Sequence, residues 1–169
     1  MSKLSKEIIE DIAHRALDEG KDYRSWTRRV LHGVQKYFTF ITDDIVQSGV
    51  ALAGGGANSV IGSCGAFSGG LMVLSAKFSP RSDLLSAKEL EQLAYARSKC
   101  NQFRDWFISE FGSVACRDVQ FKTLGRVYNI MDEQEFQKFM EYQQESGKYC
   151  REISMKAALK VTEIISQEK

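Results

Sequence analysis

The segment Ile45–Ala76 constrains the fold more than any other part of the sequence, because it contains no charged residue. It is long enough to cross a membrane, but three consecutive glycines, Gly54–Gly56, would break a helix in its middle. Its interspersed serines and amides also keep the hydropathy modest. Instead of a membrane span we expect a short helix over 43–51, a glycine loop over 54–63 and a helix over 64–78 that is buried on all sides.

The rest of the chain has the spacing of amphipathic helices, with apolar residues recurring every three or four positions. Ser86 and Glu89 predict a capping box at a helix start, and Gly112 is suited to end the same helix. Asp132 with Glu135 predicts a second capped helix. The long helix carries the stripe Leu90, Leu93, Ala96, Cys100, Phe103, Phe107 and Phe111. A further apolar stripe over 9–16 predicts a helix that ends near Gly20. Other apolar stripes cover 26–41, 114–121 and 150–165.

The length of 169 residues fits one domain, and no repeat, low-complexity tail or long linker divides the chain. There is a single proline, Pro80, and long stretches are rich in good helix formers. We therefore expect residues 1–169 to form a single all-α domain. The expected architecture is a bundle of about six to eight helices, with the glycine loop leading into a buried central helix.

The net charge of the chain limits the kinds of partner that it can bind through electrostatic attraction. With 23 Lys and Arg against 22 Asp and Glu, the net charge is +1, which argues against binding nucleic acid or an anionic membrane through bulk charge. Residues 1–6 are polar, and the apolar residues that follow alternate with carboxylates, so no secretory signal is expected at this end and the expected location is cytoplasmic.

Four cysteines, Cys64, Cys100, Cys116 and Cys150, lie far apart with no CxxC pair, so neither zinc-finger nor c-type haem spacing is present. In a reducing compartment they start as thiols. Cys64 lies at the predicted start of the buried helix, where unpaired amides and the helix dipole favour a thiolate that is reactive or binds a metal. The alternative is that Cys64 is a small buried hydrophobe. Cys100 lies on the apolar stripe, so we expect it to serve in packing.

The glycine-rich segment is a candidate for cofactor binding, because exposed amides at a helix start attract anions. The candidate residues are Gly54, Gly55, Gly56, Gly65 and Gly69. No Gly-Lys-Ser/Thr follows and no strand clearly precedes, so neither nucleotide-binding motif is complete. The alternative is that the glycines let backbone pass close to backbone, and that Gly65 and Gly69 let another helix approach.

Together these segments resemble a known family. The sequence Cys64-Gly65-Ala66-Phe67-Ser68-Gly69 follows the glycine triplet, Phe111-Gly112-Ser113-Val114-Ala115-Cys116 comes next, and Cys150 precedes Ala157 and Ala158. Order and spacing are similar, from about Ala13 to Ile165, to the redox-active proteins named for a Cys, Cys-Gly-Ala-x-x-Gly, Cys, Cys pattern. The resemblance implies a small helical protein whose cysteines are redox-active or bind a metal; a related sequence forms part of split-Soret cytochromes.

The chain departs from this pattern at one position. The family's first cysteine aligns with Tyr23-Arg24-Ser25-Trp26, where this chain has none, and Cys100 lies off the pattern. Cys64, Cys116 and Cys150 remain as the candidate catalytic and metal-binding residues. A missing ligand could be replaced by Cys100 or a histidine, or Trp26 could fill the space as part of the core.

Two functions follow from the resemblance and this departure. The first is a thiol redox or thiolate metal-binding protein, an oxidoreductase or electron-transfer accessory centred on Cys64, with Cys116 or Cys150 as its partner. It would take a metal ion or cluster as cofactor and a redox protein as partner, and could form a homodimer. The second is a scaffold for a small ligand or a protein, whose sulfurs now only pack. We expect Cys64, Cys116 and Cys150 to meet in space, with Trp26 lining the same space, whereas dispersed sulfurs would favour the scaffold.

Overall fold

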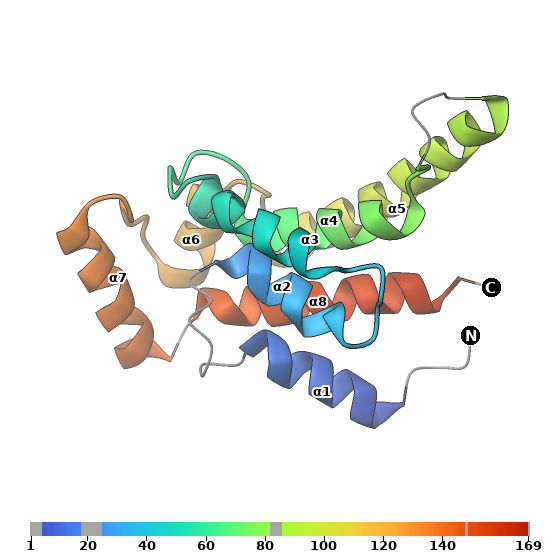
Figure 1. The fold of residues 1–169 in the computed structure, drawn as a ribbon. Coiled ribbons are helices and arrows are strands. Elements are labelled where there is room, and N and C mark those ends of the chain that lie inside the picture. The colour runs from blue at the N-terminus through green and yellow to red at the C-terminus, as the bar shows by residue number, and fades with distance from the viewer. Residues whose placement is uncertain (1–4, 18–24, 82–85, 148, 169) are drawn as a thin grey trace.

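Eight α-helices and one 3-10 helix account for most of the residues that the computed structural model describes, which are 5–17, 25–81, 86–147 and 149–168 (Figure 1). The elements are α1 Lys6–Leu17, α2 Trp26–Gln35, α3 Asp43–Ser48, η1 Gly49–Gly55, α4 Gly65–Phe78, α5 Ala87–Phe111, α6 Cys116–Leu124, α7 Glu133–Ser146 and α8 Cys150–Ser166. Over these ranges the chain forms no strand, and has one isolated antiparallel bridge between Ser63 and Ala115. The predicted all-α fold is confirmed. The predicted helix end near Gly20 lies outside the described residues.

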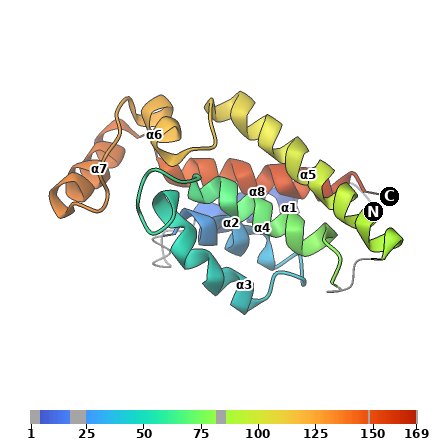
Figure 2. The same cartoon turned by 90° about the horizontal axis from the view of Figure 1, so that it is seen from above.

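Helix α8 runs through the middle of the bundle and contacts α1, α2, α4 and α5 (Figures 1 and 2). Its buried positions recur with helical spacing, which gives it an apolar face along most of its length. They include Ile153, Ala157, Val161 and Ile164. Helices α1 and α2 pack on α8 from one side, while α4 and α5 complete the core.

Helix α4 is largely buried, as the uncharged segment predicts, but not on all sides, since Ser75 near its end is exposed. Its glycines set how closely the neighbouring helices approach: a Cβ on Gly69 would lie 2.8 Å from the carbonyl oxygen of Thr27 in α2. On Gly70 it would lie 2.3 Å from the ring of Phe103 in α5. The predicted close approach at Gly65 and Gly69 is confirmed, since a Cβ on Gly65 would lie 3.0 Å from Thr27 Oγ1.

Helix α5 has the predicted ends. Ser86 Oγ accepts a hydrogen bond from the Glu89 amide, the Glu89 carboxylate accepts one from the Ser86 amide, and Gly112 ends the helix with φ 81°. The stripe is buried at Ala96 and again from Phe103 to the end of the helix, while Cys100 between them is only partly buried. The start of α5 projects beyond the other helices (Figure 1), so Leu90 is 52% exposed.

The predicted helix over 43–51 is shorter than expected. It stops at Ser48, and the chain continues as η1, in which Ala53 is already extended. A close contact with α2 accompanies this change, because a Cβ on Gly49 would lie 3.0 Å from Leu31. At the other end of the molecule α7 stands apart from the bundle, beside α6 (Figures 1 and 2).

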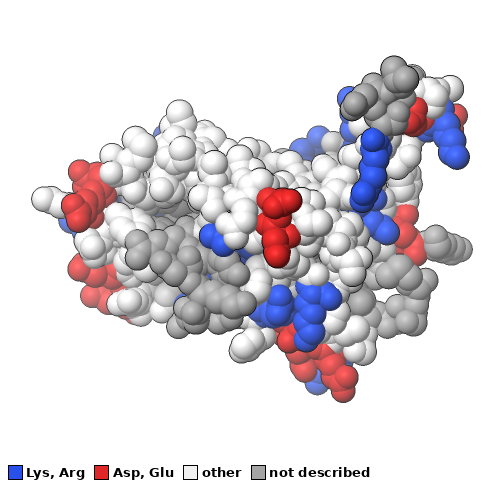
Figure 3. Space-filling model, in the orientation of Figure 1, with Lys and Arg blue, Asp and Glu red and all other residues white. Residues whose placement is uncertain are grey.

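Figure 3 shows a broad uncharged area at its upper left, where η1 and the following loop lie in Figure 1. Exposed apolar side chains there include Val50, Leu52 and Ile61. Within the described ranges, no helix combines the length and the hydropathy that a membrane span requires.

Candidate functional site

Four helices begin around one small cavity. Cys64 is the N-cap of α4, Cys116 is the first residue of α6, and Cys150 is the first residue of α8. Trp26 is the first residue of α2, so it takes the same helix-start position as the cysteines. Each helix start carries a partial positive charge, so the four together favour negative charge in the space between them.

The glycine loop holds the starts of α4 and α6 side by side. The Cys64 amide donates to the carbonyl of Val114 at 2.7 Å, and the Cys116 amide donates to the carbonyl of Gly62 at 2.8 Å. These bonds flank the bridge between Ser63 and Ala115. Two cysteines that are far apart in sequence are thus fixed to neighbouring backbone segments.

The loop can form only because several of its positions are glycine. Gly54, Gly55 and Gly56 all have positive φ, and a Cβ on Gly55 would lie 2.9 Å from the backbone of Val60. Val60 itself has φ 67°, a strained conformation for a β-branched residue, and is held by hydrogen bonds from its own amide to Gly54 and from Arg117 to its carbonyl. The close passage of backbone past backbone accounts for these glycines, and their predicted role in binding a cofactor stays a prediction.

Cys150 is positioned by a buried amide. Its backbone N–H donates to Gln143 Oε1 of α7 at 2.9 Å, and Gln143 is only 2% exposed. One turn further along α8, the Ser154 hydroxyl donates to the carbonyl of Trp26 at 3.0 Å and ties α8 to the start of α2.

The cavity between these helix starts has a volume of about 10 Å³, enough for one water molecule at most. It is lined by Trp26, Gly54, Cys64, Cys116, Val119, Gln120, Ile130, Phe139 and Cys150. The prediction that the three pattern cysteines meet, with Trp26 beside them, is confirmed. Cys100 does not line it. All four cysteines are free thiols.

Burial controls the ionisation of these thiols. Burial, together with the neighbouring Cys116, raises the pKa of Cys64 to about 12, although the amides of Ala66 and Phe67 act to lower it. Burial likewise raises the pKa of Cys150 well above its usual value, with Cys64 and Cys116 adding to the effect. The prediction of a thiolate at Cys64 is therefore wrong: the helix-start amides are present, but the loss of hydration outweighs them.

Cys116 differs from the other two thiols because a side chain supports its charged form. Burial raises its pKa, but the Gln120 amide donates to Cys116 Sγ at 3.5 Å and lowers it. The Gln120 carbonyl oxygen accepts from the Tyr128 amide, which fixes its orientation. Sequence analysis missed Gln120, although its spacing of four from Cys116 on a predicted helix was the available signal.

Cys100 packs against the core, as its place on the stripe predicts, but it is only partly buried. Its sulfur lies 4.0 Å from the Ser75 hydroxyl of α4. Partial burial raises the pKa of its thiol, and the Ser75 hydroxyl lowers it. Lying outside the cavity, it does not replace the missing family cysteine.

The metal-binding prediction for Cys64, Cys116 and Cys150 gains no support from the geometry. Among the described residues, no group of three or more His, Cys, Asp or Glu side chains is arranged to hold a metal ion.

No curated protein and no solved structure matches the chain. A family model does match residues 27–164, which include all three cavity cysteines. The match begins just after Trp26. The chain therefore belongs to the family described as "Putative redox-active protein (C_GCAxxG_C_C)".

Proposed function

We propose that the protein is a thiol redox protein in which Cys116 and Cys64 interconvert between a dithiol and a disulfide. The observation that carries the proposal is the convergence of three helix-start cysteines on one cavity. The positive ends of those helices stabilise negative charge that develops on sulfur during thiol exchange.

We choose Cys64 and Cys116 as the reacting pair because of the N–H groups that lie near their sulfurs. Cys116 Sγ accepts from Gln120, and the nearby amides of Ala66 and Phe67 act to lower the pKa of Cys64. For Cys150 the causes of its raised pKa are burial and the other two cysteines, with no donor that lowers it. Cys116 and Cys64 thus have the better support for a transient thiolate.

The reaction uses a disulfide as oxidant. The Cys116 thiolate attacks one sulfur of the oxidant, forming a mixed disulfide and releasing the first thiol. Cys64 then attacks Cys116 Sγ in the mixed disulfide, which forms the Cys64–Cys116 bond and releases the second thiol. The two cysteine protons end on the two released thiols, so the protein is oxidised by two electrons and the oxidant is reduced by two.

Access to the sulfurs requires an opening, since the cavity holds one water molecule at most. Helix α7 is the element best placed to provide it. It stands apart from the bundle (Figures 1 and 2). Of its two buried side chains, Phe139 lines the cavity and Gln143 accepts a hydrogen bond from the Cys150 amide. Displacing α7 would hydrate the thiols and lower the pKa values that burial raises.

The test is equilibration of the protein in dithiothreitol buffers of graded potential, followed by disulfide mapping by mass spectrometry. We expect one reversible intramolecular Cys64–Cys116 disulfide in the wild type and in Cys100→Ser. Cys116→Ser and Cys64→Ser should each lose it.

A protein that stays fully reduced at every potential would overturn the proposal and favour the ligand-binding scaffold. A disulfide that forms only between Cys64 and Cys150 would overturn the chosen pair. Circular dichroism of each variant is the control for folding.

A further inference from the structure

A chain of contacts links Cys116 of the thiol cavity to helix α7. Gln120 Nε2 donates to Cys116 Sγ at 3.5 Å, and Gln120 Oε1 accepts from the Tyr128 amide at 3.0 Å. The Tyr128 ring then meets two rings of α7, those of Phe139 and Tyr142, at centroid distances of 5.5 and 6.1 Å. The contacts therefore run without a break from a reacting sulfur to the helix that covers the cavity.

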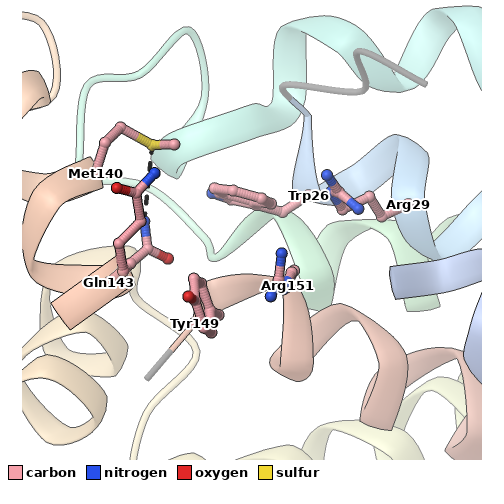
Figure 4. Close-up of a pocket in the computed structure, with 7 residues that line it drawn as sticks. Trp26, Arg29, Met140, Gln143, Tyr149 and Arg151 are labelled. Atoms are coloured by element: carbon pink, nitrogen blue, oxygen red, sulfur yellow. Dashed lines mark hydrogen bonds between the residues drawn. The ribbon is translucent and has the colours of Figure 1, made fainter. Parts of the chain in front are cut away.

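A second link joins α7 to Cys150. Gln143 Oε1 accepts from the Cys150 amide at 2.9 Å, and Gln143 Nε2 lies 3.8 Å from Met140 Sδ on the same helix. Figure 4 shows these two side chains of α7 beside Trp26, with which they line one pocket. Both Gln120 and Gln143 are buried, so a hydrogen bond that either amide loses is not replaced by water while the structure stays closed.

Formation of the disulfide acts directly on the first link. Cys64 and Cys116 are free thiols in the structure, so their sulfurs must move together to about 2.05 Å when one S–S bond replaces two S–H bonds. The two protons and two electrons pass to the disulfide oxidant, as in the exchange described above. Cys116 Sγ is then tied to Cys64 and leaves its place at Gln120 Nε2, where it is at best a weak acceptor.

The effect reaches α7 through residues 126–128. When the buried Gln120 amide loses its acceptor, it must turn to find another, and turning takes its oxygen away from the Tyr128 amide. Arg126 of the same segment pairs with Glu135 of α7. Residues 126–128 thus hold α7 both by ring contacts and by an ion pair, and loosening this segment loosens the helix.

We propose that α7 is a redox-controlled cover of the thiol cavity, held closed in the dithiol protein and released when the Cys64–Cys116 disulfide forms. Gln120 is the positioning residue that links the two events. This control rests on the proposed function, because it requires that disulfide. It goes beyond it in that the reaction itself opens the cavity, which lets a reductant reach the disulfide and restore the dithiol.

The test is hydrogen–deuterium exchange, read by mass spectrometry, on the reduced and the oxidised protein in the Cys100→Ser background. We expect the amides of residues 133–146 in α7 to exchange at least about tenfold faster in the oxidised protein. Those of residues 153–165 in the buried helix α8 should change by less than about twofold. Cys116→Ser, treated with the same oxidant, should show no change in α7, because it cannot form the disulfide.

Gln120→Met tests the link itself. Methionine is similar in length but has no N–H for Cys116, so α7 should exchange faster in the reduced variant and change little on oxidation. The Cys64–Cys116 disulfide of the variant should also be at least about threefold more stable in dithiothreitol buffers, because only the dithiol loses a bond. Gln137→Met, the same change at an exposed position of α7, should behave like the wild type.

Disulfide mapping of the same samples separates the two proposals. A Cys64–Cys116 disulfide that forms without faster exchange in α7 overturns this inference and leaves the proposed function standing, whereas absence of the disulfide overturns both. Equal α7 exchange in the reduced wild type and reduced Gln120→Met also overturns the inference. The comparison of redox states needs no variant of Gln120, so it decides the question even if circular dichroism shows that Gln120→Met does not fold.

Discussion

Raising the pH should destabilise the folded protein through its buried thiols. The pKa of Cys64 is about 12 in the folded state, against 9.0 for an ordinary thiol. Below pH 9 both states keep the proton, so Cys64 contributes no pH dependence. Between pH 9 and 12 the unfolded chain loses the proton and the folded chain keeps it, so unfolding becomes more favourable as the pH rises. At pH 10 the cost from Cys64 alone is about 1.4 kcal/mol.

The assay is chemical denaturation at pH 7 and pH 10 under reducing conditions, for the wild type and Cys64→Ala. Other titrating groups cancel in the comparison, so the wild type should lose about 1.4 kcal/mol more unfolding free energy than the variant. Cys150→Ala should reduce the loss in the same way, because burial raises the pKa of Cys150 too. Equal losses in the wild type and both variants would refute the argument that burial controls these thiols.

Three further predictions concern accessibility and packing. At pH 7 iodoacetamide should modify Cys100 at least about tenfold faster than Cys64 or Cys150, measured by mass spectrometry, because a pKa of about 12 leaves roughly one Cys64 in 10⁵ ionised; equal rates would contradict this. Phe139→Ala, which removes a wall of the thiol cavity, should speed modification of Cys64, whereas Phe121→Ala, which removes an exposed ring, should leave the rate unchanged. Gly70→Ala should lower the unfolding free energy by about 1–3 kcal/mol, since its Cβ would lie 2.3 Å from the Phe103 ring; the exposed Ser75→Ala on the same helix should change it little, and a stabilised Gly70→Ala would show that the ring moves freely.

Local patterns were enough to predict most of the helices. Capping at Ser86 and Asp132 and the glycine at 112 act within a few residues, so their effects can be read from the sequence. The stripe of α5 misled because helical spacing does not say where a helix leaves the core. Leu90 has the same periodicity as Phe103 but lies on the part of α5 that projects, and Cys100 is only partly buried.

The sequence predicted the cysteines of the site but not the residues of α7 that lie beside them. The family pattern and the need to bury α4 brought Cys64, Cys116 and Cys150 together, and this was confirmed. Gln143 and Phe139 were not singled out as site residues, because they lie on α7, and only tertiary packing places that helix over the cavity.

The ionisation of Cys64 was predicted with the wrong sign, and the magnitudes explain why. A charge at a helix N-terminus gains at most about 2 kcal/mol, or roughly 1.5 pH units. Complete burial can raise a pKa by about 3–5 units. The same helix start therefore lowers the pKa of a hydrated thiol and fails to do so in a closed cavity. It follows that the four helix starts assist thiol chemistry only when water reaches the sulfurs. Movement of α7 would then control the reactivity of Cys116 and Cys64 more strongly than any single hydrogen bond to them.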